Sequence, residues 1–121
     1  MARRIFSRLE FIAFTTELAY NYVNMMIDTH CHLDFKDYDN DRDDVINRAL
    51  KAGVTRMINV ASSIDGSHRS VELANRYDMV YATVGIHPHD AKTVTDAALS
   101  DLKALAKDKK VVAIGEVGLD Y

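Results

Sequence analysis

The chain has 121 residues, of which 48% are hydrophobic and 27% are charged, and this composition is typical of one globular domain. Its formal net charge of -3 argues against a protein that holds nucleic acid through a basic surface, because such a surface needs clustered Lys and Arg. The single cysteine excludes an intrachain disulfide and suits a reducing, cytoplasmic compartment, and no run approaches the ~18 apolar residues that a membrane span requires.

Residues 1–25 are expected to form an N-terminal extension that contains a short amphipathic helix. Early arginines followed by apolar residues imitate a secretory signal, but Glu10 and Glu17 interrupt the apolar run and no small-residue cleavage site follows. Ser7 and Glu10 instead form a capping-box pattern at the start of a helix. A mis-assigned initiation site or an added leader before Met26 is the alternative interpretation of this segment.

From residue 26 onward, short β-rich runs alternate with helical patterns. The expected strands are Met26 to Cys31, Thr55 to Ala61, Met79 to Gly85 and Lys110 to Gly115. The expected helices run from near Asp41 to Gly53, which is placed as a residue just beyond the helix end, from Ile64 to Tyr77, and from a Thr95 cap onward. In the last helix, a stripe of leucines at helical spacing is expected to be buried: Leu99, Leu102 and Leu105.

Apolar strands separated by crossover helices predict a parallel sheet that is covered on its faces. The expected strands start about 24 to 31 residues apart, and a (β/α)₈ barrel of ~250 residues averages ~31 residues per unit. Four units therefore predict an α/β fold that is the first half of a TIM-type barrel, with residues 26–121 as a partial barrel domain. The two outer strands of half a barrel leave unpaired backbone groups, which favours self-association through the open edges.

A histidine pair lies at the end of the first expected strand. Because side chains alternate along a strand, Asp28, His30 and His32 share one face, and Cys31 points away from it. The two imidazoles can therefore converge on one cation, whereas a Cys/His zinc site is not expected. Two hydrogen-bonded histidines in a turn are the alternative, but the carboxyl ends of barrel strands are where catalytic residues lie.

Two further segments follow the third and fourth expected strands. Glu116 lies at the same edge of the sheet as the histidine pair, where a carboxylate can bridge two cations, although a solvated loop glutamate is the alternative. His87 and His89, on either side of a proline, could donate to a phosphate or support the cation ligands, or they could simply be exposed.

Taken together, the segments IDTHCHLDF, GIHPHDA and IGEVGLDY resemble successive signatures of the TatD family of metal-dependent deoxyribonucleases, from Met26 to Tyr121. The resemblance implies a (β/α)₈ barrel that acts on DNA, with His30, His32 and Glu116 as ligands of divalent cations. Two cations per complete site are expected, with Mg, Mn and Zn all open, and Glu116 is the expected catalytic residue. In that family, further histidines and an aspartate from the second half of the barrel complete the site.

The expected function is hydrolysis of DNA phosphodiester bonds by a metal-activated water, with His87 and His89 as substrate-binding residues. No membrane partner is expected. Two alternatives remain: a catalytically inactive half-barrel fragment, and an amidohydrolase-type enzyme that cleaves C–N bonds on the same fold.

Overall fold

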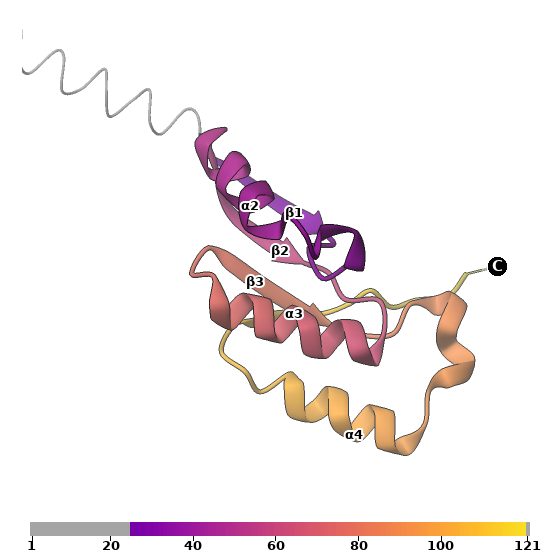
Figure 1. Cartoon of the computed structure of the whole chain (residues 1–121). Helices are drawn as coiled ribbons and strands as arrows, with labels where there is room; N and C mark the ends of the chain where they lie inside the picture. The colour runs from indigo at the N-terminus through magenta and orange to yellow at the C-terminus, as the bar shows by residue number, and fades with distance from the viewer. Residues whose placement is uncertain (1–24, 121) are drawn as a thin grey trace, which may run out of the picture.

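The computed structural model describes residues 25–120, so the expected N-terminal helix lies outside the described residues. Four parallel strands form one sheet in the order β1-β2-β3-β4, and each strand is joined to the next by a crossover that contains a helix. Figure 1 shows β1, β2 and β3 side by side, with α3 and α4 stacked beyond β3. The strands are β1 (Met26–Cys31), β2 (Val54–Asn59), β3 (Val80–Val84) and β4 (Val111–Ile114).

The helices begin and end at the residues that the sequence marks for these positions. They are α2 (Arg42–Lys51), α3 (Ile64–Arg76) and α4 (Asp96–Leu105), with short 3-10 turns η1 (Lys36–Tyr38) and η2 (Pro88–Thr93). The side-chain hydroxyls of Ser63 and Thr95 accept hydrogen bonds from the backbone amides of Gly66 in α3 and Ala98 in α4. After α2 the chain reverses at Gly53, whose φ of 96° favours glycine because other residues carry a Cβ that clashes there.

The hydrophobic core lies between the sheet and the two helices α2 and α3. Met57, Val80 and Ala82 of the strands pack against Ile46 of α2 and Leu73 of α3, and all five are buried. Burying a side chain of this size stabilises the fold by roughly 1.5–3 kcal/mol relative to leaving it exposed. This layer fixes how the strand ends, and the loops that follow them, lie relative to one another.

The expected buried leucine stripe of α4 is wrong. No residue of α4 is buried and Leu99 is 42% exposed, because α4 packs beside α3 rather than over the sheet. Polar contacts hold α4 and the turn after it to α3: His68 pairs with Asp101 at 2.7 Å, and the Asn75 amide donates to Asp108 at 2.9 Å. The amphipathic spacing of the leucines therefore predicted the helix correctly, but it did not predict how far the helix would be buried.

The expectation that both faces of the sheet are covered is also wrong for the described residues. Large apolar side chains of the two outer strands are exposed, including Ile27 at 61%, Val112 at 50% and Ile114 at 58%. The helices α2 and α3 share one core, so they cover the same face of the sheet, and the opposite face remains open at β1 and β4.

Candidate metal centre

Three side chains from two strand ends converge at the carboxyl edge of the sheet. The Nε2 atoms of His30 and His32 lie 3.3 Å apart, and the Glu116 Oε2 atom lies 3.9 Å from the His30 Nε2 atom. Each of the three residues offers one possible ligand atom, a ring nitrogen or a carboxylate oxygen, and these three atoms all lie within 4.8 Å of one another. The sequence placed these three residues at one edge of a sheet, and the structure brings them together.

The segment that follows β2 holds the loops of the site in place. Three successive backbone carbonyls of this segment accept one hydrogen bond each: Val60 from the His32 Nδ1 atom at 2.8 Å, Ala61 from the Glu116 amide at 2.9 Å, and Ser62 from the His87 amide at 2.9 Å. Sequence reasoning missed this segment, because its contribution comes from backbone carbonyls that every residue carries.

The tautomer of His32 follows from its contact with Val60. A carbonyl oxygen can only accept, so the His32 Nδ1 atom carries the hydrogen and the neutral ring keeps its Nε2 lone pair for a cation. The Phe35 ring stacks on this imidazole with a centroid distance of 4.7 Å and an interplanar angle of 12°, which further fixes its orientation. Metal-binding histidines are commonly held in this way.

The spacing of the two imidazoles fits a shared cation. Two nitrogen ligands that each lie ~2.0–2.1 Å from one ion at a tetrahedral angle stand ~3.4 Å apart, close to the 3.3 Å between the His30 and His32 Nε2 atoms. Two imidazole nitrogens and one carboxylate are also donors that Zn²⁺ and Mn²⁺ accept. The residues present therefore fit a divalent cation.

The end of β4 is held at the site by close backbone packing against the end of β3 and Gly85. The Thr83 hydroxyl donates to the Gly115 carbonyl at 2.7 Å, and the Gly115 amide donates to the Val84 carbonyl at 3.0 Å. A Cβ atom on Gly85 would lie only 2.7 Å from the carbonyl carbon and oxygen of Gly115. Gly85 therefore has no room for a side chain where the loop to Glu116 passes.

The two histidines in the loop that follows β3 lie beside this cluster, but at different distances from Glu116. The His87 Nε2 atom is 3.7 Å from the Glu116 Oε1 atom, whereas the more exposed His89 contacts Asp120. Both rings line a cavity of about 440 Å³ with His32, Phe35, Ser62, Asp90 and Glu116. The structure thus places His87 nearest to the carboxylate and His89 toward the rim.

Cys31 points away from the cluster, as the strand alternation predicts. Its thiol donates to the Ile58 carbonyl at 3.4 Å and packs against the core beneath the helices. Burial, together with the nearby Asp28 charge, raises the pKa of Cys31 from 9.0 to about 12. A thiol with this pKa remains protonated and is a poor metal ligand.

A buried polar network that sequence reasoning missed supports the loop after His32. The Asn59 side chain donates to the Asp34 carboxylate at 2.9 Å and to the Ser70 hydroxyl at 3.0 Å, and all three residues are buried. Arg42 and Arg69 donate to backbone carbonyls of the same loop. The signal that could have pointed to this network is Asn59 itself, a polar residue at a buried position of β2.

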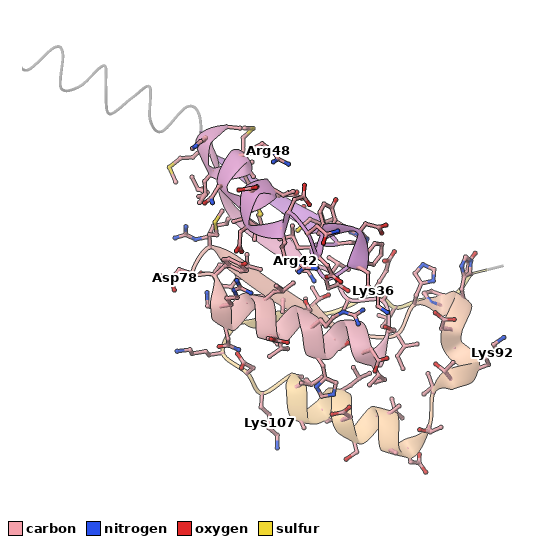
Figure 2. The ribbon with its side chains drawn as sticks, viewed as in Figure 1. Lys36, Arg42, Arg48, Asp78, Lys92 and Lys107 are labelled. Atoms are coloured by element: carbon pink, nitrogen blue, oxygen red, sulfur yellow. The ribbon has the colours of Figure 1, made fainter. Side chains whose placement is uncertain are left out.

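Several basic side chains are spread over the described part of the chain. In Figure 2, Arg48, Lys92 and Lys107 lie on or beside three different elements. This distribution agrees with the net charge of -3, so a positive field for phosphate has to come from elsewhere. Within residues 25–120, no helix is long and apolar enough to cross a membrane.

The fold and the site define a class: the first half of a parallel β/α barrel with a cluster of side chains that could hold a cation at the carboxyl ends of its strands. The model of the TatD related DNase family matches residues 27–121, and the chain belongs to this family.

Curated relatives support this assignment. The chain is 42% identical over 96 residues to a 3'-5' ssDNA/RNA exonuclease TatD from Cronobacter sakazakii, and that match covers 79% of this chain and 36% of the relative. It is 43% identical over 97 residues to the uncharacterized metal-dependent hydrolase YabD from Bacillus subtilis, which covers 80% of this chain and 38% of the relative.

Solved structures give the same result. The crystal structure of the TatD homologue YJJV from Escherichia coli K12 superposes with a TM-score of 0.72 at 37% identity, and a TatD family hydrolase from Entamoeba histolytica with a TM-score of 0.72 at 28% identity. Each match covers 80% of this chain and 38% of the other. The chain therefore spans less than two fifths of the length of these relatives.

Proposed function

We propose that this chain contributes the first part of the active site of a metal-dependent nuclease that cleaves phosphodiester bonds of DNA. The observation that carries the proposal is the convergence of His30, His32 and Glu116 on one point at the carboxyl edge of the sheet. The relatives named as ssDNA/RNA exonucleases support single-stranded nucleic acid as the substrate class. The low net charge adds support, because bound cations would replace the missing basic surface.

In this proposal, His30 and His32 would hold a divalent cation, and Glu116, the proposed catalytic residue, would supply a carboxylate that a second cation could share. Mg, Mn and Zn are the candidate ions. Bound cations of this kind polarise a phosphoryl group and activate a water for attack. The loop that carries His87 and His89 lines the cavity beside the three ligands and would contact the substrate phosphate.

Metal analysis of wild-type chain and of a His30→Ala, His32→Ala double variant tests the proposal. We expect the double variant to lose bound Zn²⁺ or Mn²⁺ after dialysis, because two of the three donors are removed. His68→Ala is the matched control, since this imidazole is exposed on α3 and pairs with Asp101. Equal metal content in the double variant and the wild type would reject the proposed function.

Two further proposals concern the organisation of the protein. We propose that residues 1–25 are an extension outside the hydrolase domain, which begins at residue 26, and that the protein acts in the cytoplasm. The family match to residues 27–121 supports this boundary. Limited proteolysis followed by mass spectrometry would test it, because cleavage should concentrate before residue 26.

A second candidate function follows from the open outer strands. We propose that the chain alone self-associates through β1 and β4 and is catalytically inactive in that form. Exposed Ile27 and Ile114 on these strands support the proposal. Analytical ultracentrifugation with a parallel assay on single-stranded DNA tests it. A stable monomer would reject self-association, and turnover of DNA would reject inactivity.

A further inference from the structure

The imidazole of His87 is held in the opposite tautomer from that of His32. The His89 amide donates to the His87 Nδ1 atom at 3.1 Å, and an atom that accepts a hydrogen bond must present a lone pair. In the neutral ring the hydrogen is then on Nε2. His32 has the reverse arrangement, because its Nδ1 atom donates to the Val60 carbonyl and its Nε2 atom carries the lone pair. The two rings therefore differ at Nε2: the His32 Nε2 atom can ligate a cation, whereas the His87 Nε2 atom can only donate a hydrogen bond.

The Nε2 atom of His87 faces the Glu116 carboxylate. It lies 3.7 Å from Oε1, while the other carboxylate oxygen, Oε2, is 3.9 Å from the His30 Nε2 atom. The carboxylate thus lies between a donor on one side and a candidate cation ligand on the other. The His87 ring is itself anchored, because its backbone amide donates to the Ser62 carbonyl and Pro88 begins the η2 turn that follows.

We propose that His87 is a positioning residue for Glu116, an inference that rests on the proposed cation site. In the loaded site, its Nε2–H group would donate to Oε1 and so direct Oε2 toward a cation held with His30 and His32. The 3.7 Å between the His87 Nε2 and Glu116 Oε1 atoms exceeds hydrogen-bond length, so the proposal requires the Glu116 carboxylate to move toward His87 when the site is loaded. Such contacts commonly tighten only when a site is loaded. His89, which lies nearer the rim, then remains for the substrate phosphate.

The tautomers can be measured directly without any cation. In ¹⁵N-histidine-labelled chain, long-range ¹H–¹⁵N correlation spectra at a pH where the rings are neutral distinguish protonation at Nδ1 from protonation at Nε2. We expect His87 to be protonated at Nε2 and His32 at Nδ1. A His87 ring protonated at Nδ1 would overturn the inference, whatever the outcome of the metal analysis.

A matched pair of variants tests the positioning role. In His87→Gln, the side-chain amide nitrogen can reach the place of Nε2 and still donate to Glu116, whereas the shorter side chain in His87→Asn can accept from the His89 amide but cannot reach the carboxylate. We expect Zn²⁺ affinity, measured by calorimetric titration, to fall about 10- to 100-fold in His87→Asn and to be largely retained in His87→Gln. Equal affinities in the two variants would overturn the positioning role. A wild-type chain that binds no Zn²⁺ or Mn²⁺ would instead reject the proposed function, and the spectra would then decide the tautomer on their own.

Discussion

Cys31 lies between the two histidines in sequence but on the other side of the strand. Its thiol is held at the Ile58 carbonyl and burial raises the pKa of Cys31 to about 12. We therefore expect iodoacetamide to modify the native chain very slowly at pH 8, and quickly once urea unfolds it, because only the thiolate reacts. Mass spectrometry of the alkylated chain provides the measurement. Equal rates in the native and unfolded chain would contradict the core-facing, half-buried orientation of Cys31.

The same pKa shift predicts how stability depends on alkaline pH. The thiol of Cys31 ionises near 9.0 when exposed and near 12 in the folded chain, so the unfolded state loses its proton first. The contribution of the protonated Cys31 thiol to the free energy of unfolding is therefore fully present below pH 9 and is lost as the pH rises toward 12. Cys31→Ser, with a less acidic hydroxyl, should flatten this decline in urea titrations between pH 8 and 10. An unchanged dependence of the free energy of unfolding on pH in Cys31→Ser would contradict the raised pKa of Cys31.

Asn59 is the residue on which the buried network beneath the site depends. Replacing it with alanine removes the donors to Asp34 and Ser70 and leaves a buried carboxylate without this partner. We expect Asn59→Ala to lower the free energy of unfolding by about 1–3 kcal/mol or more. Urea denaturation measures the loss, and Asn47→Ala, at an exposed position of α2, should change stability by no more than about 0.5 kcal/mol.

At the scale of elements, the sequence predicted the order of strands and helices and most of their ends. Helix ends were predictable because Gly53 and Thr95 act locally, through backbone conformation and side-chain capping. The position of α4 was not predictable, since its contact with α3 depends on His68 and Asp101, which are 33 residues apart. Strand alternation likewise placed His30 and His32 together, but it could not reveal the carbonyls of the segment after β2 that hold them.

Gly85 is where two elements approach most closely. The added Cβ of Gly85→Ala would meet the Gly115 backbone at 2.7 Å, and backbone atoms cannot rotate away as a flexible side chain can. We expect the variant to lose about 1–3 kcal/mol of stability and to bind Zn²⁺ more weakly, because the loop to Glu116 must shift. Gly115→Ala is the matched control, since its Cβ has no neighbour closer than 3.9 Å. Similar losses in both variants would contradict this explanation.

For the whole molecule, strand spacing predicted half of a barrel, and the structure and its relatives confirm the parallel order and the fold. The sequence did not predict that one face of the sheet would be open, because near-continuous apolar strands are typical of parallel sheets that are covered on both faces. Val112 and Ile114 are ordinary core residues by composition, yet they are half exposed or more in the described chain.

This open face leads to a prediction about assembly. If the chain self-associates through its outer strands, charged residues on β4 should weaken the association, because burying an unpaired charge against apolar side chains is costly. We expect a Val112→Lys, Ile114→Lys double variant to sediment as a smaller species than the wild type at the same concentration. Leu50→Lys, which changes an exposed leucine on α2, is the control and should sediment like the wild type. The core of the double variant should remain intact, because both substituted side chains lie outside the cluster formed by α2, α3 and the inner strands. An unchanged assembly in that folded variant would place the contact surface away from β4.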